Sequence, residues 1–165
     1  LWVNRPARDK SAPARDEHLS KETLPRVNEA DGAGTVRVMA GDCEQTHGAA
    51  ATFTELNVWD VDVKAGKETR VSVPAGHSLS MVVLRGEAMF NGQDTAKAGQ
   101  LIGFEDGAGA VSITAVGEDV KILLLSGIPI DEPVVGYGPF VMNSEDEIRA
   151  AIDDFNSGRF GRIPA

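Results

Sequence analysis

The three histidines of the chain are the first residues to test for metal or acid–base chemistry. They are His18, His47 and His77. No two of them share a spacing that would place both on one metal ion, and an isolated loop histidine is more often solvated or capping than ligating. His18 falls in a polar connector, and the other two lie in or directly after turns. We therefore predict that this chain contributes no metal ligand.

The serines and glycines do not add a catalytic motif. The sequence has no Gly-x-Ser-x-Gly elbow, and the serines have no plausible histidine and acid partner. The glycine-rich segment at residues 103–109 is followed by neither a lysine nor a helical pattern, so it is interpreted as a loose hairpin loop and not as a phosphate loop. The sequence predicts no catalytic and no cofactor-binding residue here.

The single cysteine indicates in which redox compartment the protein works and whether its thiol is reactive. Cys43 cannot form an intramolecular disulfide, which favours a reducing, cytoplasmic setting. Its neighbours Asp42 and Glu44 are acidic and should raise the pKa of the thiol. We expect Cys43 to be non-catalytic.

Composition excludes two classes of partner. The 165 residues include 16 basic and 25 acidic side chains, for a formal net charge of −9. Such a charge repels phosphate backbones, so direct nucleic-acid binding is not expected. The longest apolar run, at residues 121–125, is strand-sized, and a membrane helix needs about 20 residues. We expect no membrane partner.

The middle of the chain has the pattern of an antiparallel β domain. Trp59 begins an alternation of apolar and charged residues through residues 59–64, which predicts one buried face with Trp59 in the core. Asn91-Gly92 is a strong hairpin signal. Short apolar runs separated by turn residues suggest about eight strands, the number of a jelly roll. A β-sandwich of another topology is the alternative.

The two ends of the chain have different patterns. Leu1, Trp2 and Val3 resemble a strand entered at full hydrophobicity, and a polar, proline-punctuated connector follows over residues 5–31. Near the other end, Ser144 and Glu147 have capping-box spacing. An apolar stripe of Ile148, Ala151, Ile152 and Phe155 and a Gly158 C-cap predict an amphipathic helix over about residues 145–157.

The central turns and strands resemble a cupin barrel. The resemblance covers the turn and strand of residues 74–87, the Asn91-Gly92 turn and the AGQL step at residues 98–101. Cupins carry His-x-His and a Glu near the first of these, and a further His after the second. Here only His77 stands near the first cluster, Leu79 occupies the Glu position, and no histidine follows Gly99. The resemblance therefore implies a cupin barrel without its metal site.

A more specific resemblance extends over nearly the whole chain. The matching stretches are LWVNRPA at residues 1–7, TFT at 52–54, NVWDV at 57–61, SGIPIDEPVVGYGPFVMN at 126–143, IRAAI at 148–152, Phe155, and GRFG at 158–161. Together they resemble the pirin family. Pirins are bicupins whose first barrel holds one iron through three histidines and a glutamate, whereas the second barrel is usually metal-free.

The resemblance implies an all-β fold: a cupin-type jelly-roll β-barrel with an N-terminal strand and connector and one C-terminal α-helix. Residues 1–33 would be the last strand of an absent N-terminal cupin barrel plus the connector. Residues 34–130 would be the degenerate C-terminal barrel, and residues 131–165 a C-terminal loop and amphipathic helix. Iron would bind in the absent barrel, and none in this chain.

Two functions are implied for the parent protein. It resembles an iron-dependent quercetin 2,3-dioxygenase acting on an aromatic or flavonol substrate, with this chain alone inactive and the N-terminal cupin half as its partner. The alternative is a regulatory module that binds a protein as a transcriptional or metabolic co-regulator, without catalysis. A free-standing, metal-less, ligand-binding cupin is a third interpretation.

Overall fold

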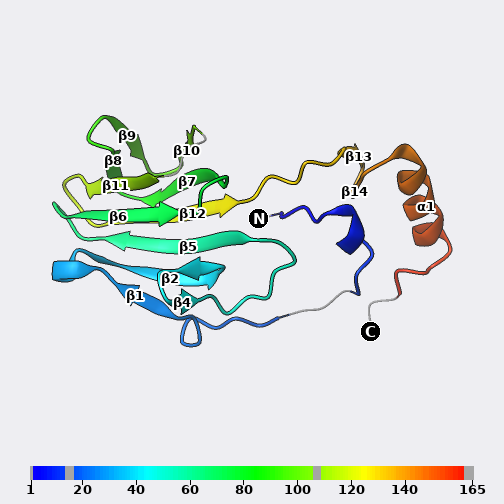
Figure 1. Cartoon of the computed structure of the whole chain (residues 1–165), viewed down its shortest axis with the longest axis horizontal. Helices are drawn as coiled ribbons and strands as arrows, with labels where there is room; N and C mark the ends of the chain where they lie inside the picture. The colour runs from blue at the N-terminus through cyan, green and yellow to red at the C-terminus, as the bar shows by residue number, and fades with distance from the viewer. Residues whose placement is uncertain (1, 14–16, 106–108, 162–165) are drawn as a thin grey trace. The chain divides into compact units, whose positions relative to one another are not determined.

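The computed structural model describes residues 2–13, 17–105 and 109–161, which fold largely into β-strands (Figure 1). The chain divides into two compact units. One, the barrel unit, is Arg15–Pro129. The other, the terminal unit, combines both ends of the chain, Leu1–Ala14 and Ile130–Ala165. No helix in the described ranges is long and apolar enough to cross a membrane.

Two antiparallel sheets make up most of the barrel unit. The larger has six strands in the order β1 (Arg26–Asn28), β2 (Gly34–Ala40), β5 (Leu56–Val63), β12 (Val120–Gly127), β7 (Ser78–Arg85) and β10 (Leu101–Phe104). The smaller has four, in the order β6 (Glu68–Val73), β11 (Gly109–Ala115), β8 (Glu87–Phe90) and β9 (Asp94–Lys97). The two-residue strands β3 (Asp42–Cys43) and β4 (Thr46–His47) form a small separate hairpin.

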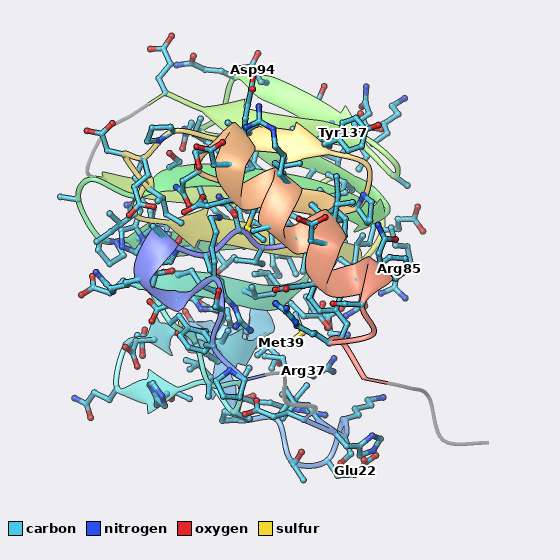
Figure 2. The ribbon with its side chains drawn as sticks, turned by 90° about the vertical axis from the view of Figure 1, so that its right-hand side faces the viewer. Glu22, Arg37, Met39, Arg85, Asp94 and Tyr137 are labelled. Carbon is cyan, nitrogen blue, oxygen red and sulfur yellow. The ribbon has the colours of Figure 1, made fainter. Side chains whose placement is uncertain are left out.

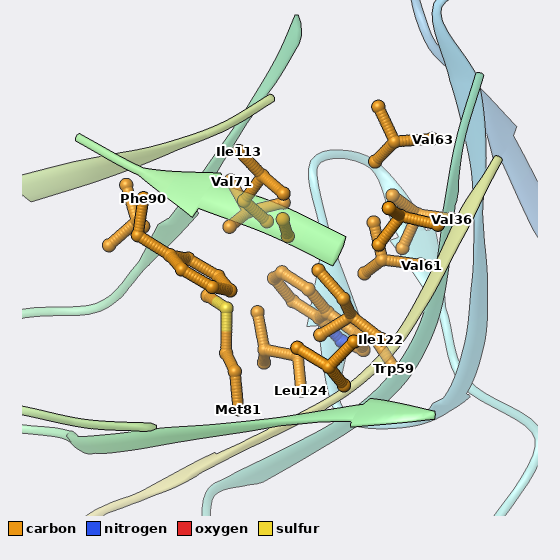
Figure 3. Packing of buried hydrophobic residues seen from close by; sticks show 14 of the residues in the cluster. Val36, Trp59, Val61, Val63, Val71, Met81, Phe90, Ile113, Ile122 and Leu124 are labelled. Carbon is orange, nitrogen blue, oxygen red and sulfur yellow. The ribbon is translucent and has the colours of Figure 1, made fainter. Parts of the chain in front are cut away.

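The core of the barrel unit follows from strict alternation along the strands. β5 and β12 bury every second residue, as expected for sheets with one face on a core. Trp59 is 2% exposed, which confirms its predicted core position. Figure 3 shows apolar side chains from both sheets pointing toward one another, among them Trp59, Met81, Phe90 and Leu124. Hydrophobic packing therefore fills the interior.

The turns confirm one prediction and correct another. Asn91 and Gly92 both have positive φ, 52° and 67°, and they join the paired strands β8 and β9 as predicted. The glycine-rich segment at residues 103–109 is different: β10 pairs with β7, whereas β11 pairs with β6 and β8. The segment therefore connects two sheets, and its interpretation as a hairpin loop is wrong. Its residues 106–108 lie outside the described ranges.

The N-terminal segment departs from its predicted pattern in two places. Strand β1 pairs with β2 inside the stretch interpreted as a connector, and a 3₁₀ turn, η2 (Ala30–Gly32), joins the two strands. Three residues are too few to reveal an alternation in sequence. At the start, Leu1 lies outside the described ranges, and Trp2–Asn4 form no strand. A strand needs a neighbour to accept its hydrogen bonds.

The terminal unit contains the predicted helix, α1 (Glu145–Asn156). The Ser144 hydroxyl accepts a hydrogen bond from the Glu147 amide at 3.3 Å, and Glu147 Oε2 accepts one from the Ser144 amide at 3.1 Å, so the capping box is confirmed. Gly158 follows the helix with φ 76°, as a C-terminal cap requires. The unit also holds a 3₁₀ turn, η1 (Ala7–Asp9), and a hairpin of β13 (Val135–Tyr137) and β14 (Phe140–Met142).

Candidate functional site

A buried polar cluster lies where three strands of the six-stranded sheet come together. Among the described residues, the buried polar side chains are Asn57, Thr69, His77 and Ser126, and all but Thr69 belong to this cluster. Asn57 on β5 is directly opposite Ser126 on β12. His77 immediately precedes β7, whose Leu79 is the other neighbour of Ser126. Strand register therefore brings together residues that are distant in sequence.

Hydrogen bonds define the roles of the cluster. The Asn57 amide nitrogen donates to Ser126 Oγ at 2.9 Å, and Asn57 Oδ1 accepts from the Asp42 backbone amide at 3.0 Å. Ser126 Oγ also lies 3.4 Å from His77 Nδ1. The serine hydroxyl can both accept from Asn57 and either donate to or accept from Nδ1, so it links the asparagine to the imidazole.

The second nitrogen of His77 faces a carboxylate. Nε2 is buried, has no hydrogen-bond partner in the described part of the chain, and lies 4.0 Å from Glu55 Oε2. The Glu55 side chain itself is 78% exposed. Only a protonated imidazole would form an ion pair across this gap. The arrangement provides one histidine and one carboxylate.

These residues do not fit a metal centre. Catalytic metal sites usually have at least three protein ligands. Within the described ranges, no group of three or more His, Cys, Asp or Glu side chains could hold a metal ion. Leu79, where the cupin resemblance would place a glutamate, is 8% exposed and packs in the hydrophobic core. We derive no chemical step through a metal in this barrel.

Nucleophilic catalysis does not fit the cluster either. Ser126 lies next to His77, but it faces Nδ1, and Glu55 lies 4.0 Å from Nε2, so the three do not form a hydrogen-bonded serine–histidine–acid triad. Ser126 is also only 8% exposed, and its oxygen is held by Asn57. A nucleophile must be reachable by substrate and free to attack. The cluster is therefore a buried element that joins β3, β5, β7 and β12.

The other predicted positions have mixed outcomes. His77 is 5% exposed, so its interpretation as a solvated loop histidine is wrong: the turn closed by its amide on Pro74 O is followed by β7, and the ring lies against Ser126. His18 and His47 are exposed, as predicted, and His47 Nδ1 lies 2.6 Å from Asp42 Oδ1. Burial raises the pKa of the Cys43 thiol to about 11, with smaller contributions from the Glu44 and Glu29 carboxylates. The predicted direction is confirmed, although burial is the main cause.

A second polar group lies on the outer face of the six-stranded sheet. Lys121 Nζ contacts Asp60 Oδ1 at 2.7 Å and Asp62 Oδ2 at 2.8 Å, and Arg37 Nη1 contacts Asp60 Oδ2 at 2.6 Å. Arg85 Nη2 lies 3.9 Å from Asp62 (Figure 2 labels both arginines). These side chains come from four adjacent strands, and most are less than one-third exposed. They form a cross-strand ion-pair network that stabilises the sheet.

The family model described as the pirin C-terminal cupin domain matches residues 58–161. The chain belongs to the pirin family. The sequence-based assignment to this family is thus confirmed.

Pirin-family relatives match the chain along almost its whole length. It is 44% identical over 162 residues to the putative quercetin 2,3-dioxygenase PA2418 of Pseudomonas aeruginosa, covering 98% of this chain and 56% of that protein. It is 31% identical over 163 residues to a pirin-like protein of Solanum lycopersicum, covering 98% of this chain and 55% of that protein. The chain thus spans about half the length of these curated relatives.

A solved structure confirms the fold. The crystal structure of a quercetin 2,3-dioxygenase from Acinetobacter baumannii matches with a TM-score of 0.90 and 38% sequence identity, covering 99% of this chain and 56% of that one. The predicted class, a mostly β cupin fold with one C-terminal helix, is therefore correct. In the described ranges the two sheets remain separate and do not close into one continuous barrel.

Proposed function

We propose that this chain is the C-terminal half of a two-barrel pirin protein that acts as a quercetin 2,3-dioxygenase-type oxidoreductase. One observation carries the proposal: 98% of the chain aligns at 44% identity with a putative quercetin 2,3-dioxygenase, of which it covers 56%. The iron site and the aromatic or flavonol substrate would belong to the N-terminal barrel. A cytoplasmic location is part of the proposal, because the lone Cys43 is unpaired.

The packing of the barrel unit supports this division of labour. Its interior is filled by apolar side chains such as Trp59, Met81 and Ile122, which leaves no set of ligands facing inward among the described residues. When bound in the other barrel, iron would activate dioxygen and the aromatic ring. The role of the present chain would then be to support that barrel and supply part of its surroundings.

The proposal is tested with the longer encoded protein and the 165-residue chain side by side. The sequence before Leu1 should contain His-x-His, a later histidine and a glutamate. The longer protein should oxidise a flavonol, lose this activity on chelation and regain it with ferrous iron. The 165-residue chain should contain no stoichiometric iron and show no turnover. About one iron per purified 165-residue chain would overturn the assignment.

A second candidate is a regulatory protein-binding role. Some relatives are named only as pirins, including Pirin-1 of Arabidopsis thaliana at 32% identity over 166 residues. The strong acidity of the chain, with a net charge of −9, would favour a basic protein partner. A partner that remains bound after the iron ligands are replaced would favour this role. Flavonol turnover that depends on those ligands would count against it.

A further inference from the structure

The outer face of the six-stranded sheet has a polar hollow that begins at the edge strand β1. Its volume is about 460 Å³, and its walls come from β1, β2, β5 and β7 and from the turns beside them. Every lining residue belongs to the barrel unit, and Val63 is the one large apolar residue among them. A hollow of this volume can hold a small molecule. We call it the β1 hollow.

Two arginines stand directly opposite each other in the β1 hollow. Arg26 on β1 pairs with Arg37 on β2 in the antiparallel register, so both side chains lie on the same face of the sheet. Directly opposite residues have Cβ atoms about 5 Å apart, and like charges at such positions destabilise a sheet. An anion that contacts both guanidinium groups would remove this repulsion.

The neighbouring carboxylates do not neutralise the arginine pair. Arg37 Nη1 contacts Asp60 Oδ2 at 2.6 Å, but the other oxygen of Asp60 is taken by Lys121 at 2.7 Å. Arg37 Nε is buried and has no hydrogen-bond partner in the part of the chain that the structure describes. Arg26 forms no ion pair within the described ranges, although its charge acts on the Glu22 carboxylate. The pair therefore retains capacity for an anion.

A second row of polar side chains lies beside the arginine pair, two residues further along the strands. Asn28 is opposite Thr35, and Thr35 is opposite Asp62. Two residues of strand place this row about 7 Å from the arginines. Asp62 Oδ2 contacts Lys121 at 2.8 Å, whereas its Oδ1 lies 3.9 Å from Arg85 Nη2 and can accept another hydrogen bond. Amide, hydroxyl and carboxylate groups of this kind suit the hydroxyl groups of a ligand.

We propose that the β1 hollow binds a small phosphorylated polyhydroxy compound, with its phosphate on Arg26 and Arg37 and its hydroxyl groups on Asn28, Thr35 and Asp62. Guanidinium groups bind phosphate oxygens through paired, charge-assisted hydrogen bonds. The net charge of −9 disfavours a long polyanion, so the ligand is a small one. The inference does not depend on the dioxygenase-type function, because no metal ligand is involved.

Calorimetric titration of the 165-residue chain at low ionic strength tests the proposal with two probes, inorganic phosphate and glucose-6-phosphate. Arg26→Gln removes one guanidinium at an exposed position, and Asn28→Ala removes an exposed amide from the second row. Arg70→Gln is the matched control, because this arginine lies on β6 of the other sheet and its side chain is 74% exposed. Circular dichroism verifies that all three variants are folded.

Arg26→Gln should weaken the binding of both probes by about tenfold or more, since it removes charge-assisted hydrogen bonds to the phosphate. Arg70→Gln should leave both affinities within about twofold. Asn28→Ala should weaken the binding of glucose-6-phosphate alone.

Three results would overturn the proposal. Neither probe may bind saturably, or the two arginine variants may weaken binding equally, which would indicate non-specific attraction to positive charge. Equal affinity of the unaltered chain for both probes would identify free phosphate as the ligand and reject the polyhydroxy compound.

Discussion

In the barrel unit, 20 residues from both sheets form one buried cluster around Trp59, Met81 and Ile122, whereas the described part of the terminal unit buries three residues and exposes six large apolar ones. Both units use apolar residues at positions set by regular secondary structure. In the barrel unit, the alternating apolar faces of both sheets meet in this cluster, although Leu84 and Leu101 at the strands β7 and β10 stay exposed. In the terminal unit, the same kind of face is left open, as on α1 at Phe155.

This difference distinguishes a self-sufficient part of the chain from a dependent one. A two-sheet domain of about a hundred residues can bury enough surface to fold alone. A hairpin with one helix cannot. Core substitutions in the barrel unit should therefore destabilise the 165-residue chain, whereas substitutions of exposed apolar residues in the terminal unit should not.

The largest effect is expected for the two tryptophans. Trp59→Ala should lower the free energy of unfolding of the 165-residue chain by about 3–5 kcal/mol, because it removes a large side chain from a packed core. Trp2→Ala, at a side chain 70% exposed, should change it by less than about 0.5 kcal/mol. Urea unfolding followed by circular dichroism measures both. Similar losses for the two variants would contradict the contrast.

The buried polar cluster should give the next largest effect. His77→Ala removes a buried ring and the hydrogen-bond partner of Ser126, which should cost about 1–3 kcal/mol of unfolding free energy. The matched control is His47→Ala, because that side chain is 76% exposed and should cost less than about 0.5 kcal/mol. Thermal unfolding of both variants compares them, and a neutral His77 variant would show that the cluster does not hold the strands.

The ion-pair network on the outer face should contribute less. Lys121→Met leaves Asp60 and Asp62 without their shared cation and should cost about 1–2 kcal/mol, since these groups are partly buried. Lys97→Met is the control, because the Lys97 side chain is 71% exposed and its one pair, with Glu87 at 3.5 Å, should be worth at most about 1 kcal/mol. Denaturant titrations measure the free energy of unfolding of both variants. Equal losses would show that the network stabilises the sheet no more than a single surface ion pair does.

Ionisation of the Cys43 thiol should not affect stability at neutral pH and should lower it in alkali. Its folded-state pKa is raised from 9.0 to about 11, so the folded state retains the thiol proton after the unfolded chain has lost it. The stabilisation is complete below pH 9 and is lost as the pH rises through about 11. A Cys43→Ala variant should lack this part of the alkaline decline. An identical pH profile for both proteins would show that the thiol does not titrate this way.

The sequence predicted what depends on local patterns. The Asp60 and Asp62 alternation gave the strand, the Ser144–Glu147 pair gave the start of the helix, and Asn91-Gly92 gave the hairpin. Each signal lies within a few residues, so the chain need not be folded to see it. Cys43 was likewise interpreted correctly from its immediate neighbours, although burial, the larger cause, was not visible.

The remainder depends on contacts between distant residues. Asn57, His77 and Ser126 meet only because β5, β7 and β12 are neighbours with a particular register. The connection after β10 changes sheets, which no local turn signal shows. Trp2–Asn4 have the composition of a strand but no neighbour to pair with in the described ranges. For that segment, the sequence predicts a strand, but a strand forms only where a neighbouring strand accepts its backbone hydrogen bonds.

Under our proposal, this chain is the half of a two-barrel pirin protein that lacks the iron site. Iron content and flavonol turnover, measured together on the 165-residue chain and on the longer encoded protein, test it most directly. We predict about one iron and chelator-sensitive turnover for the longer protein, and neither for the 165-residue chain. Stoichiometric iron with flavonol oxidation by the 165-residue chain alone would contradict the account.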